Sequence, residues 1–246
     1  MDTVLLACIA LIVGFFCGCT SIGGILLIPA IVLLSSLSIH EAMATSLFTF
    51  AIMALLGTFL HCRKGSIPWH RAAALCLGAL LSGFAGAKAN ALFSAELLNA
   101  VLALLILFAG VSALRSGSKP VLDVTTASAD RQSLVLFLLG LLVGFMAGLT
   151  GIGGPVLSVP LMIAIGFSPL TSIAVAQPLQ LIAGFSGSVI YILNGAIDYF
   201  MALWVTVIEL IGFYAGVRAA YCLNAHILRL IISLLCIVTA AYLLLR

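Results

Sequence analysis

One glycine-rich pattern occurs twice in this chain of 246 residues, and each copy interrupts a long apolar stretch. The first copy runs from Gly14 to Gly24 and the second from Gly144 to Gly154, so the two lie 130 positions apart. Consecutive glycines are poor helix formers, so each copy is expected to break a helix. In a membrane, a break frees backbone N–H and C=O groups that lipid cannot satisfy, and these groups must face protein, water or a ligand. Two such breaks in corresponding positions point to a binding site of the kind that transporters have.

Composition points to a multi-pass helical membrane protein. Hydrophobic residues make up 64% of the chain and charged residues 7%, a balance that soluble globular domains do not reach. The formal net charge of +3 gives no indication of nucleic acid binding. The seven cysteines are odd in number and most lie in apolar runs, so no disulfide framework is expected. The histidines form no metal-ligand pattern, and we expect neither a metal nor a cofactor.

Apolar runs divide the chain into two similar halves. The run 3–34 would be roughly 48 Å long as one helix, whereas the hydrocarbon core of a membrane is about 30 Å thick. The cluster 18–24 divides this run into two pieces that are each expected to be too short to span, and a re-entrant hairpin fits these lengths. The run 132–165 repeats the plan. Further spans are expected at 42–62, 72–92 and 95–114, and again at 169–193, 199–223 and 227–245.

An internal duplication that runs nearly from end to end accounts for this plan. Matches continue at the same offset of 130 positions, including Gly57 with Gly187, Gly65 with Gly195, and Gly86 with Gly216. A single long polar segment separates the halves. We therefore divide the chain into a first membrane repeat, 1–114, a linker, 115–131, and a second membrane repeat, 132–246.

Charges in equivalent loops indicate how the repeats are oriented. The loop after the second segment carries Arg63, Lys64 and Arg71 in the first half, whereas its counterpart carries Asp198 and no Lys or Arg. Under the positive-inside rule, these loops lie on opposite sides of the membrane. We expect an all-α fold of two inverted repeats, each with a re-entrant first segment and three transmembrane helices. The linker is then cytoplasmic and both termini are outside. The alternative, eight full spans with parallel halves and both termini inside, does not explain the reversed charge.

The glycine pattern, followed in both copies by Ile-Pro or Val-Pro, resembles that of the sulfite exporter TauE/SafE family, also called the toluene sulfonate uptake permease family. The stretch 41–46 and the turns 65–69 and 195–199 are also similar to that family, so the resemblance covers nearly the whole chain. It implies transport of small anions, often sulfur-containing ones such as sulfite and sulfonates, across the bacterial inner membrane. Ser21 stands where the second copy has Gly151, and Thr45-Ser46 where the second half has 175–176. These departures leave the identity of the anion open.

The two breaks supply most of the candidate anion-binding residues. After Gly24 and Gly154 a half-helix is expected to begin, and its free N–H groups and dipole favour an anion. Neighbouring hydroxyl groups and glycines complete this set: Thr20, Ser21, Gly23, Gly24, Thr150, Gly151, Gly153 and Gly154. The alternative is that such glycines only allow close helix packing, and this is the stronger interpretation for Gly14 and Gly57.

Polar side chains inside the expected spans are further candidates. Thr45 and Ser46 lie in the second segment, and Gln177 and Gln180 lie three apart on one helical face of the corresponding segment. Amide and hydroxyl donors suit oxyanions, but hydrogen bonding between helices explains the glutamines about as well. Glu209 lies in the interior of the run 199–223. Its candidate roles are a proton carrier in coupled transport, a partner of Arg218, or a neutral structural group.

The sequence therefore predicts a secondary transporter, not an enzyme, for a small sulfur-containing anion such as sulfite, thiosulfate or a sulfonate. Alternating access, with the site between the two glycine-broken hairpins, is the expected mechanism. Two alternatives stay open: a membrane thiol-redox enzyme that uses Cys17 and Cys19, and an anion channel. The expected partners are the anion and the lipid bilayer, and no nucleic acid. Proton coupling and a homo-oligomeric state stay open.

Overall fold

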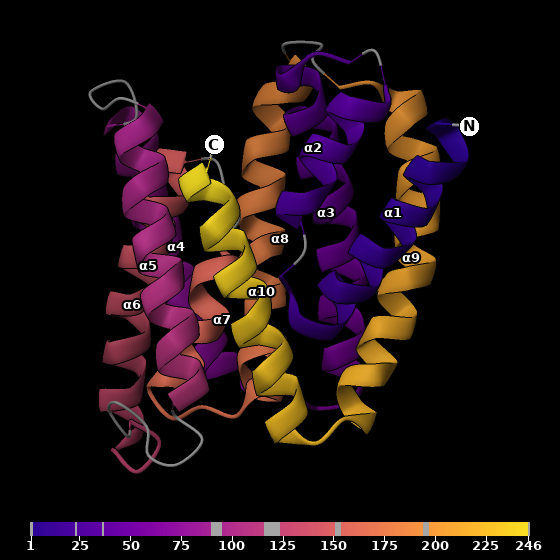
Figure 1. Cartoon of the computed structure of the whole chain (residues 1–246). Helices are drawn as coiled ribbons and strands as arrows, with labels where there is room; N and C mark the ends of the chain where they lie inside the picture. Colours follow the sequence, from indigo (N-terminus) through magenta and orange to yellow (C-terminus); the bar gives the residue numbers. More distant parts are fainter. Residues whose placement is uncertain are drawn as a thin grey trace.

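Ten helices and no strands make up the part of the chain that the structure describes (Figure 1). The computed structural model describes residues 2–22, 24–35, 37–89, 95–115, 124–150, 154–193 and 197–245. The helices are α1 (Asp2–Thr20), α2 (Gly24–Leu34), α3 (Ile39–Arg63), α4 (Trp69–Ala89), α5 (Ala95–Arg115), α6 (Ala129–Thr150), α7 (Pro155–Ala164), α8 (Pro169–Leu193), α9 (Tyr199–Cys222) and α10 (Ala225–Leu245).

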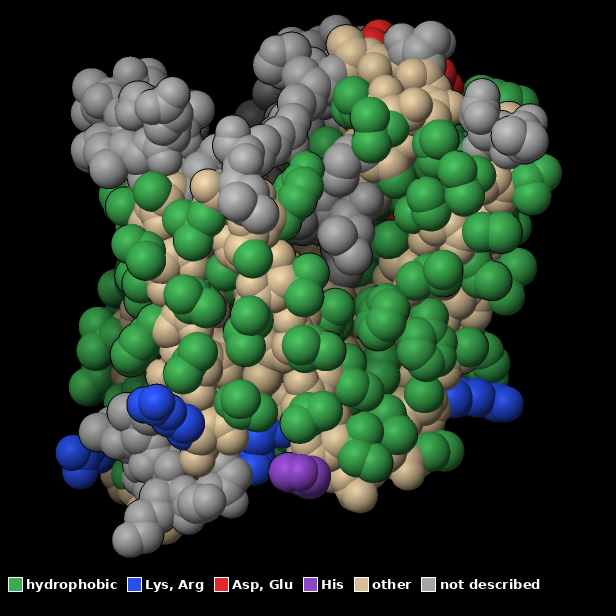
Figure 2. All heavy atoms as spheres, viewed as in Figure 1, with side chains coloured by type: hydrophobic (Ala, Val, Ile, Leu, Met, Phe, Trp, Pro, Cys, Tyr) green, Lys and Arg blue, Asp and Glu red, His purple; other side chains and the backbone are tan. Residues whose placement is uncertain are grey.

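The fold is that of a multi-pass membrane protein. Five of the described helices are long and apolar enough to cross a membrane, namely α1, α3, α6, α9 and α10. Large hydrophobic side chains point outward along the bundle, with Phe200 81% exposed, and Figure 2 shows such side chains over the middle of one face. The helices α2 and α7 have 11 and 10 residues, so each is roughly 15 Å long and too short to cross a core of about 30 Å.

Both long apolar runs are broken where the sequence predicted, because α2 begins at Gly24 within the cluster 18–24 and α7 begins at Pro155, directly after Gly154. Helix α1 continues through Gly14 and Gly18 to Thr20 and has 19 residues, and α6 has 22 residues. Both are long enough to cross a membrane by length and composition. The prediction that each piece is too short to span is therefore wrong for the first piece of each run. The early glycines do not break the helix, because they lie at a packed helix–helix contact.

Small residues bring α1 and α9 into direct backbone contact. Gly14 and Gly18 face α9, while Gly212 and Gly216 face α1, and a Cβ atom on any of them would collide with the opposite backbone. Four-residue spacing of small residues is the usual way in which membrane helices approach closely. The packing role predicted for Gly14 is confirmed. The α4–α6 pair is built in the same way from Gly78, Gly140 and Gly144.

The two halves of the chain pack across each other. The offset of 130 positions relates α1 to α6 and α4 to α9, and the most extensive contacts join α1 to α9 and α4 to α6. Helix α1 of the first half therefore packs against α9 of the second half. In the same way, α6 of the second half packs against α4 of the first half. The corresponding helices α3 and α8 also pack together, as do α5 and α10. The duplicated sequence thus forms one interlocked bundle.

The basic side chains that the structure describes gather toward one end of the bundle. In Figure 1 both termini lie toward the upper end, whereas α5 ends and α6 begins at the lower end, which we call the linker end. Figure 2 shows Lys and Arg side chains around the linker end, and the Asp and Glu side chains visible in that view at the opposite end. The basic residues whose side chains the structure describes are Arg63, Lys64, Arg71, Arg115, Arg131, Arg218 and Arg229. They lie in or just after the last turns of α3 and α5, in the second half of α9, or near the starts of α4, α6 and α10.

Replacing Gly216 by leucine is expected to destabilise the bundle. The new side chain would meet the Phe15 carbonyl and the Cys19 amide, so α1 and α9 would have to separate at a cost on the order of 3 kcal/mol. The matched control is Ala215→Leu, because Ala215 is the exposed neighbour on the same helix. We expect a lower melting temperature in detergent for G216L alone. Equal melting temperatures for the two variants would contradict the close α1–α9 contact.

Candidate functional site

The first helix break is stabilised by its own side chains. Helix α1 ends at Thr20, whose hydroxyl donates to the Phe16 carbonyl at 2.8 Å and accepts from the Ile22 N–H at 3.1 Å. Ser21 has a φ of 60°, a left-handed conformation that costs a non-glycine residue about 1–2 kcal/mol. The second half has Gly151 at the corresponding position, where a left-handed conformation would carry no such cost.

Ser21 joins this break to α8, in the other half of the chain. The Gln177 Nε2 group donates to Ser21 Oγ at 2.8 Å, and that hydroxyl donates to the Ile173 carbonyl at 3.4 Å. Ser21 is 4% exposed and Gln177 1% exposed. The other amide atom, Gln177 Oε1, is buried without a hydrogen-bond partner in the described residues and lies against Gly57 of α3. Gln177 therefore contacts both the first break and α3. At position 57 of α3 there is room only for glycine, because a Cβ atom there would collide with the Gln177 amide.

The second helix break meets the same turn of α8. Gly154 precedes α7, and Pro155 takes the first helical position, where its missing N–H costs nothing. Gly154 is buried, and a Cβ atom there would lie 3.1 Å from the Leu179 side chain. Gln177 and Leu179 flank Pro178, which lies inside α8 and donates no helical hydrogen bond. The two breaks thus contact the same proline-containing turn of α8, and they do so from different faces, because residues two apart on a helix point in different directions.

Ser158 is a polar residue near the second break that the sequence reasoning missed. It lies one turn after Gly154 in α7 and is fully buried. Its Oγ has no hydrogen-bond partner among the described residues. A hydroxyl group in an otherwise apolar half-helix is the signal that would have identified it. We define the candidate site by Ser21 and Gln177, which are hydrogen-bonded to each other, and by Gly154 and Ser158 at the second break, where the Ser158 N–H donates to the Gly154 carbonyl at 2.9 Å.

Thr45 and Ser46 lie apart from this turn. Helices α3 and α8 run antiparallel, because Gly57 contacts Gln177 while Ala51 contacts Gly184. Thr45 is twelve residues before Gly57, which is roughly 18 Å along the helix axis. The Thr45 and Ser46 hydroxyls are buried and have no hydrogen-bond partner in the described part of the chain. They lie on the part of α3 that is nearer the end opposite the linker.

The remaining predicted residues are placed as follows. Gln180 is half-buried, one turn beyond Gln177 on α8, and Gly24 is the first residue of α2. The Thr20 hydroxyl already binds backbone groups of the break. Three predicted positions, Gly23, Gly151 and Gly153, lie outside the described residues, as does the side chain of Thr150.

Glu209 is fully buried where α9 packs against α3. The Thr49 hydroxyl lies beside its carboxyl group but donates to the Ser46 carbonyl at 3.0 Å. Both Glu209 oxygens are therefore left without a hydrogen-bond partner among the described residues. Arg218 is exposed and stacks on Tyr214 at 4.7 Å, so the predicted alternative of a Glu209–Arg218 pair is wrong. An ionisable side chain buried in a span is a functional candidate.

The two cysteines of the first break do not form a redox site. Cys17 and Cys19 are 3% and 1% exposed, and neither is in a disulfide. They belong to two different apolar clusters of the bundle. A reactive thiol needs access to its reactant, which their burial denies. Across the described residues, no group of three or more His, Cys, Asp or Glu side chains could hold a metal ion.

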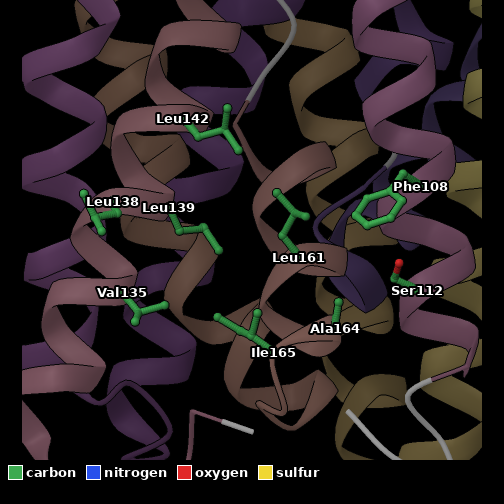
Figure 3. A pocket seen from close by; sticks show the side chains of 9 residues that line it. All are labelled: Phe108, Ser112, Val135, Leu138, Leu139, Leu142, Leu161, Ala164 and Ile165. Atoms are coloured by element: carbon green, nitrogen blue, oxygen red, sulfur yellow. The ribbon is translucent and has the colours of Figure 1, made fainter. Parts of the chain in front are cut away.

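A cavity of about 340 Å³ lies away from this site, between α5, α6 and α7 (Figure 3). Its lining comprises Phe108, Ser112, Val135, Leu138, Leu139, Leu142, Leu161, Ala164 and Ile165. Ser112 is the one lining residue with a polar side chain. An anion would lose its hydration there without compensating hydrogen bonds, so the cavity suits lipid tails better than an anionic substrate.

A multi-pass helical bundle in which two helix breaks meet at a buried polar turn is typical of membrane transporters. Comparison with known proteins identifies the family. The family model described as sulfite exporter TauE/SafE matches residues 6–243. The chain belongs to this family, and it is a membrane transporter rather than an enzyme.

Two relatives come from Bacillus subtilis (strain 168). "Probable membrane transporter protein YdhB" is 26% identical over 226 residues, which cover 87% of this chain and 89% of the relative. "Probable membrane transporter protein YunE" is 31% identical over 110 residues, which cover 44% of this chain and 40% of the relative. No solved structure matches the chain.

Substitutions of Ser21 are expected to separate two contributions to stability: that of its hydroxyl group and that of its left-handed backbone conformation. Both S21A and S21G leave the buried Gln177 amide without its partner, which costs about 1–3 kcal/mol. S21A also keeps a Cβ atom at positive φ, whereas S21G relieves that strain. We expect thermal unfolding in detergent to rank wild type first, S21G second and S21A last, with about 1 kcal/mol between the two variants. Equal stability of S21A and S21G would contradict the left-handed conformation at the break.

Proposed function

We propose that this protein is a secondary transporter of a small sulfur-containing oxyanion, such as sulfite, thiosulfate or a sulfonate. The family and the names of the relatives support membrane transport, and the family description supports a sulfur oxyanion. One structural observation carries the choice of site: both helix breaks meet the turn of α8 that contains Gln177 and Leu179. The proposed binding site lies between this turn, the two breaks and Gly57.

Hydrogen-bond donors for an anion are present at this place. Rotating the Gln177 amide by half a turn would let the Ser21 hydroxyl donate to Oε1 and would turn the NH₂ group toward Gly57. The unpartnered Ser158 hydroxyl lies one turn into α7. The first N–H groups of α2 also lie beside the first break, and helix N-termini favour anions. Helix α7 offers fewer such donors, because Pro155 has no N–H and the Leu157 and Ser158 N–H groups bind the Gly154 carbonyl. A dry site with several neutral donors suits an oxyanion that must bind and then leave.

We further propose that the halves are inverted repeats that move relative to each other in alternating access. Helix α1 begins at the end opposite the linker, while its counterpart α6 begins at the linker end (Figure 1). The short helices α2 and α7 then act as re-entrant half-helices. Under the positive-inside rule, the basic linker end is cytoplasmic and both termini are outside, in the inner membrane of a bacterium. The hydrogen bond between Ser21 and Gln177 joins the two halves, so it is a contact that such a movement would change.

Glu209 is the proposed proton carrier. Its carboxyl group is buried, and in this arrangement both oxygens lack a hydrogen-bond partner within the described residues. It lies one turn before Phe213, whose ring lies beside Gly57 at the proposed site. A carboxylic acid in such a position exchanges its proton only when water or substrate reaches it, and a coupled transporter requires this property.

Replacing Gln177 by leucine is expected to abolish most anion transport. Loss of a hydrogen bond to a charged ligand costs about 1.5–3 kcal/mol, so uptake of radiolabelled thiosulfate or sulfite into proteoliposomes should fall on the order of tenfold to a hundredfold. Ser112→Ala, in the apolar cavity, is the matched control and should transport normally. Folded Q177L that transports like the wild type would contradict the proposed site.

Gly57→Ala tests the same site without removing a polar group. An added methyl group would displace the Gln177 amide and press on the Phe213 ring. We expect G57A to reduce uptake about tenfold, and the double variant G57A/Q177L to be no worse than Q177L alone, because both changes act through one side chain. Strictly additive losses would show that Gly57 acts independently of Gln177.

Glu209→Gln should separate transport from its driving force. The amide keeps the shape of the side chain but binds no exchangeable carboxyl proton. We expect E209Q to retain exchange of labelled for unlabelled anion across the liposome membrane and to lose the acceleration that a pH gradient gives the wild type. Gradient-driven uptake that is unchanged in E209Q would contradict the proton-carrier role.

A further inference from the structure

The apolar cavity between α5, α6 and α7 has the size and lining of a site for one hydrocarbon chain. Its α6 wall is a single stripe of that helix, formed by Val135, Leu138, Leu139 and Leu142. The α7 side chains lie between those of α6 and α5 in Figure 3. The cavity has a volume of about 340 Å³. Since a methylene group takes up about as much space as a water molecule, roughly 30 Å³, the cavity has room for on the order of ten such groups.

The cavity opens toward the lipid-facing side of the bundle. Among its lining residues, Phe108 is 62% exposed, Leu138 54% and Leu142 43%. Water is disfavoured inside, because an ordered water needs about 2–4 polar partners and Ser112 is the one lining residue with a polar side chain. In a membrane, the occupant that this opening admits is a lipid chain.

Two arginines lie at the linker end of the helix faces that line the cavity. Arg115 is three residues after Ser112 on α5, and Arg131 is four residues before Val135 on α6. Residues three or four apart share a helix face, so each arginine lies one turn beyond a lining residue. Both arginines are exposed. The neighbouring carboxylate, Asp130, is adjacent to Arg131 in sequence and therefore lies on a different face of α6.

The second half of the chain repeats neither the space nor the charge. Helix α10 is the counterpart of α5, and it has Tyr242 where α5 has Ser112 and Leu245 where α5 has Arg115. A tyrosine ring takes up the space that a serine leaves open, and leucine carries no charge. The cavity and its arginines therefore do not follow from the duplicated fold alone.

We propose that this cavity binds one anionic phospholipid, with an acyl chain against α7 and the phosphate group between Arg115 and Arg131. A guanidinium group suits a phosphate because it can donate two parallel hydrogen bonds to it. The long arginine side chain can also lie along apolar surface while its charged end reaches the membrane interface. Basic pockets between membrane helices are places where anionic headgroups bind.

A lipid chain fits the cavity better than a helix from a second copy of the protein does. A helix with its side chains is about 10–12 Å across, whereas a single chain of methylene groups can enter between α5 and α6. The bound chain packs against Leu161 and Ile165 of α7, the half-helix that follows the second break. The lipid therefore stabilises this half-helix from the membrane side.

Mass spectrometry of the intact, purified full-length protein with added lipid tests the headgroup contact. We expect one tightly bound phosphatidylglycerol, and weaker binding of phosphatidylcholine with the same acyl chains. Each basic residue near a membrane surface raises affinity for anionic lipid roughly fivefold. The double variant R115Q/R131Q should therefore bind phosphatidylglycerol at least about tenfold more weakly and no longer distinguish the two lipids.

Arg218→Gln is the matched control for this experiment. Arg218 is also exposed, but it lies on α9, where it stacks on Tyr214. We expect R218Q to bind phosphatidylglycerol like the wild type. Equal binding of the two lipids by the wild type, or a loss in R218Q as large as that in R115Q/R131Q, would overturn the proposal.

Photolabelling of the wild-type protein locates the acyl chain and needs no variant. The probe is phosphatidylglycerol with a diazirine group in one acyl chain, in liposomes that hold the full-length protein. We expect the labelled peptides to contain Phe108, Leu138 or Leu142. Ser112→Tyr, which puts in the cavity the residue that the second half has, should lose this labelling. Labels on other helices only, or unchanged labelling in folded S112Y, would overturn the proposal. Neither experiment measures transport, so its failure leaves the proposed function standing.

Discussion

A helix that ends inside a membrane leaves backbone groups that lipid cannot satisfy, and the rest of this structure depends on how those groups are paired. At the first break, the Thr20 hydroxyl binds the backbone on both sides of the turn, and Ser21 adopts a left-handed conformation. Ser21 then binds Gln177, which lies 156 residues further along the chain. The break of one half is thus completed by a helix of the other half, and this dependence places a polar site where the halves meet.

Close helix packing makes that arrangement possible. Glycines on α1 and α9 let these two helices pack closely, and glycines on α4 and α6 do the same for that pair. Each pair joins one helix of the first half to one helix of the second half. The contact holds α1 straight through Gly14 and Gly18, so the break falls after Thr20, at the level of Gln177. Glu209 lies one turn before Phe213, whose ring lies beside Gly57, and it is buried with both carboxyl oxygens unpartnered among the described residues.

The sequence predicted the all-helical membrane fold, both breaks, the packing role of Gly14 and the candidacy of Gln177. It did not predict that Gly18 packs against a neighbouring helix and that α1 continues to Thr20, because this contact depends on α9. Thr45 and Ser46 were grouped with Gln177 because they occupy similar positions in their segments, but antiparallel packing of α3 and α8 separates them. The partner of Ser21 lies 156 residues away in sequence, and no local pattern reveals it.

The central claim is that the anion binds where both helix breaks meet α8. A crystal of the protein grown with a selenium-containing analogue, such as selenite, would locate the anion by its anomalous scattering. The account predicts one strong peak within hydrogen-bond distance of the Gln177 amide and beside Ser21 and Gly57. A peak only at the exposed arginines of the linker end, or only in the cavity between α5, α6 and α7, would contradict it.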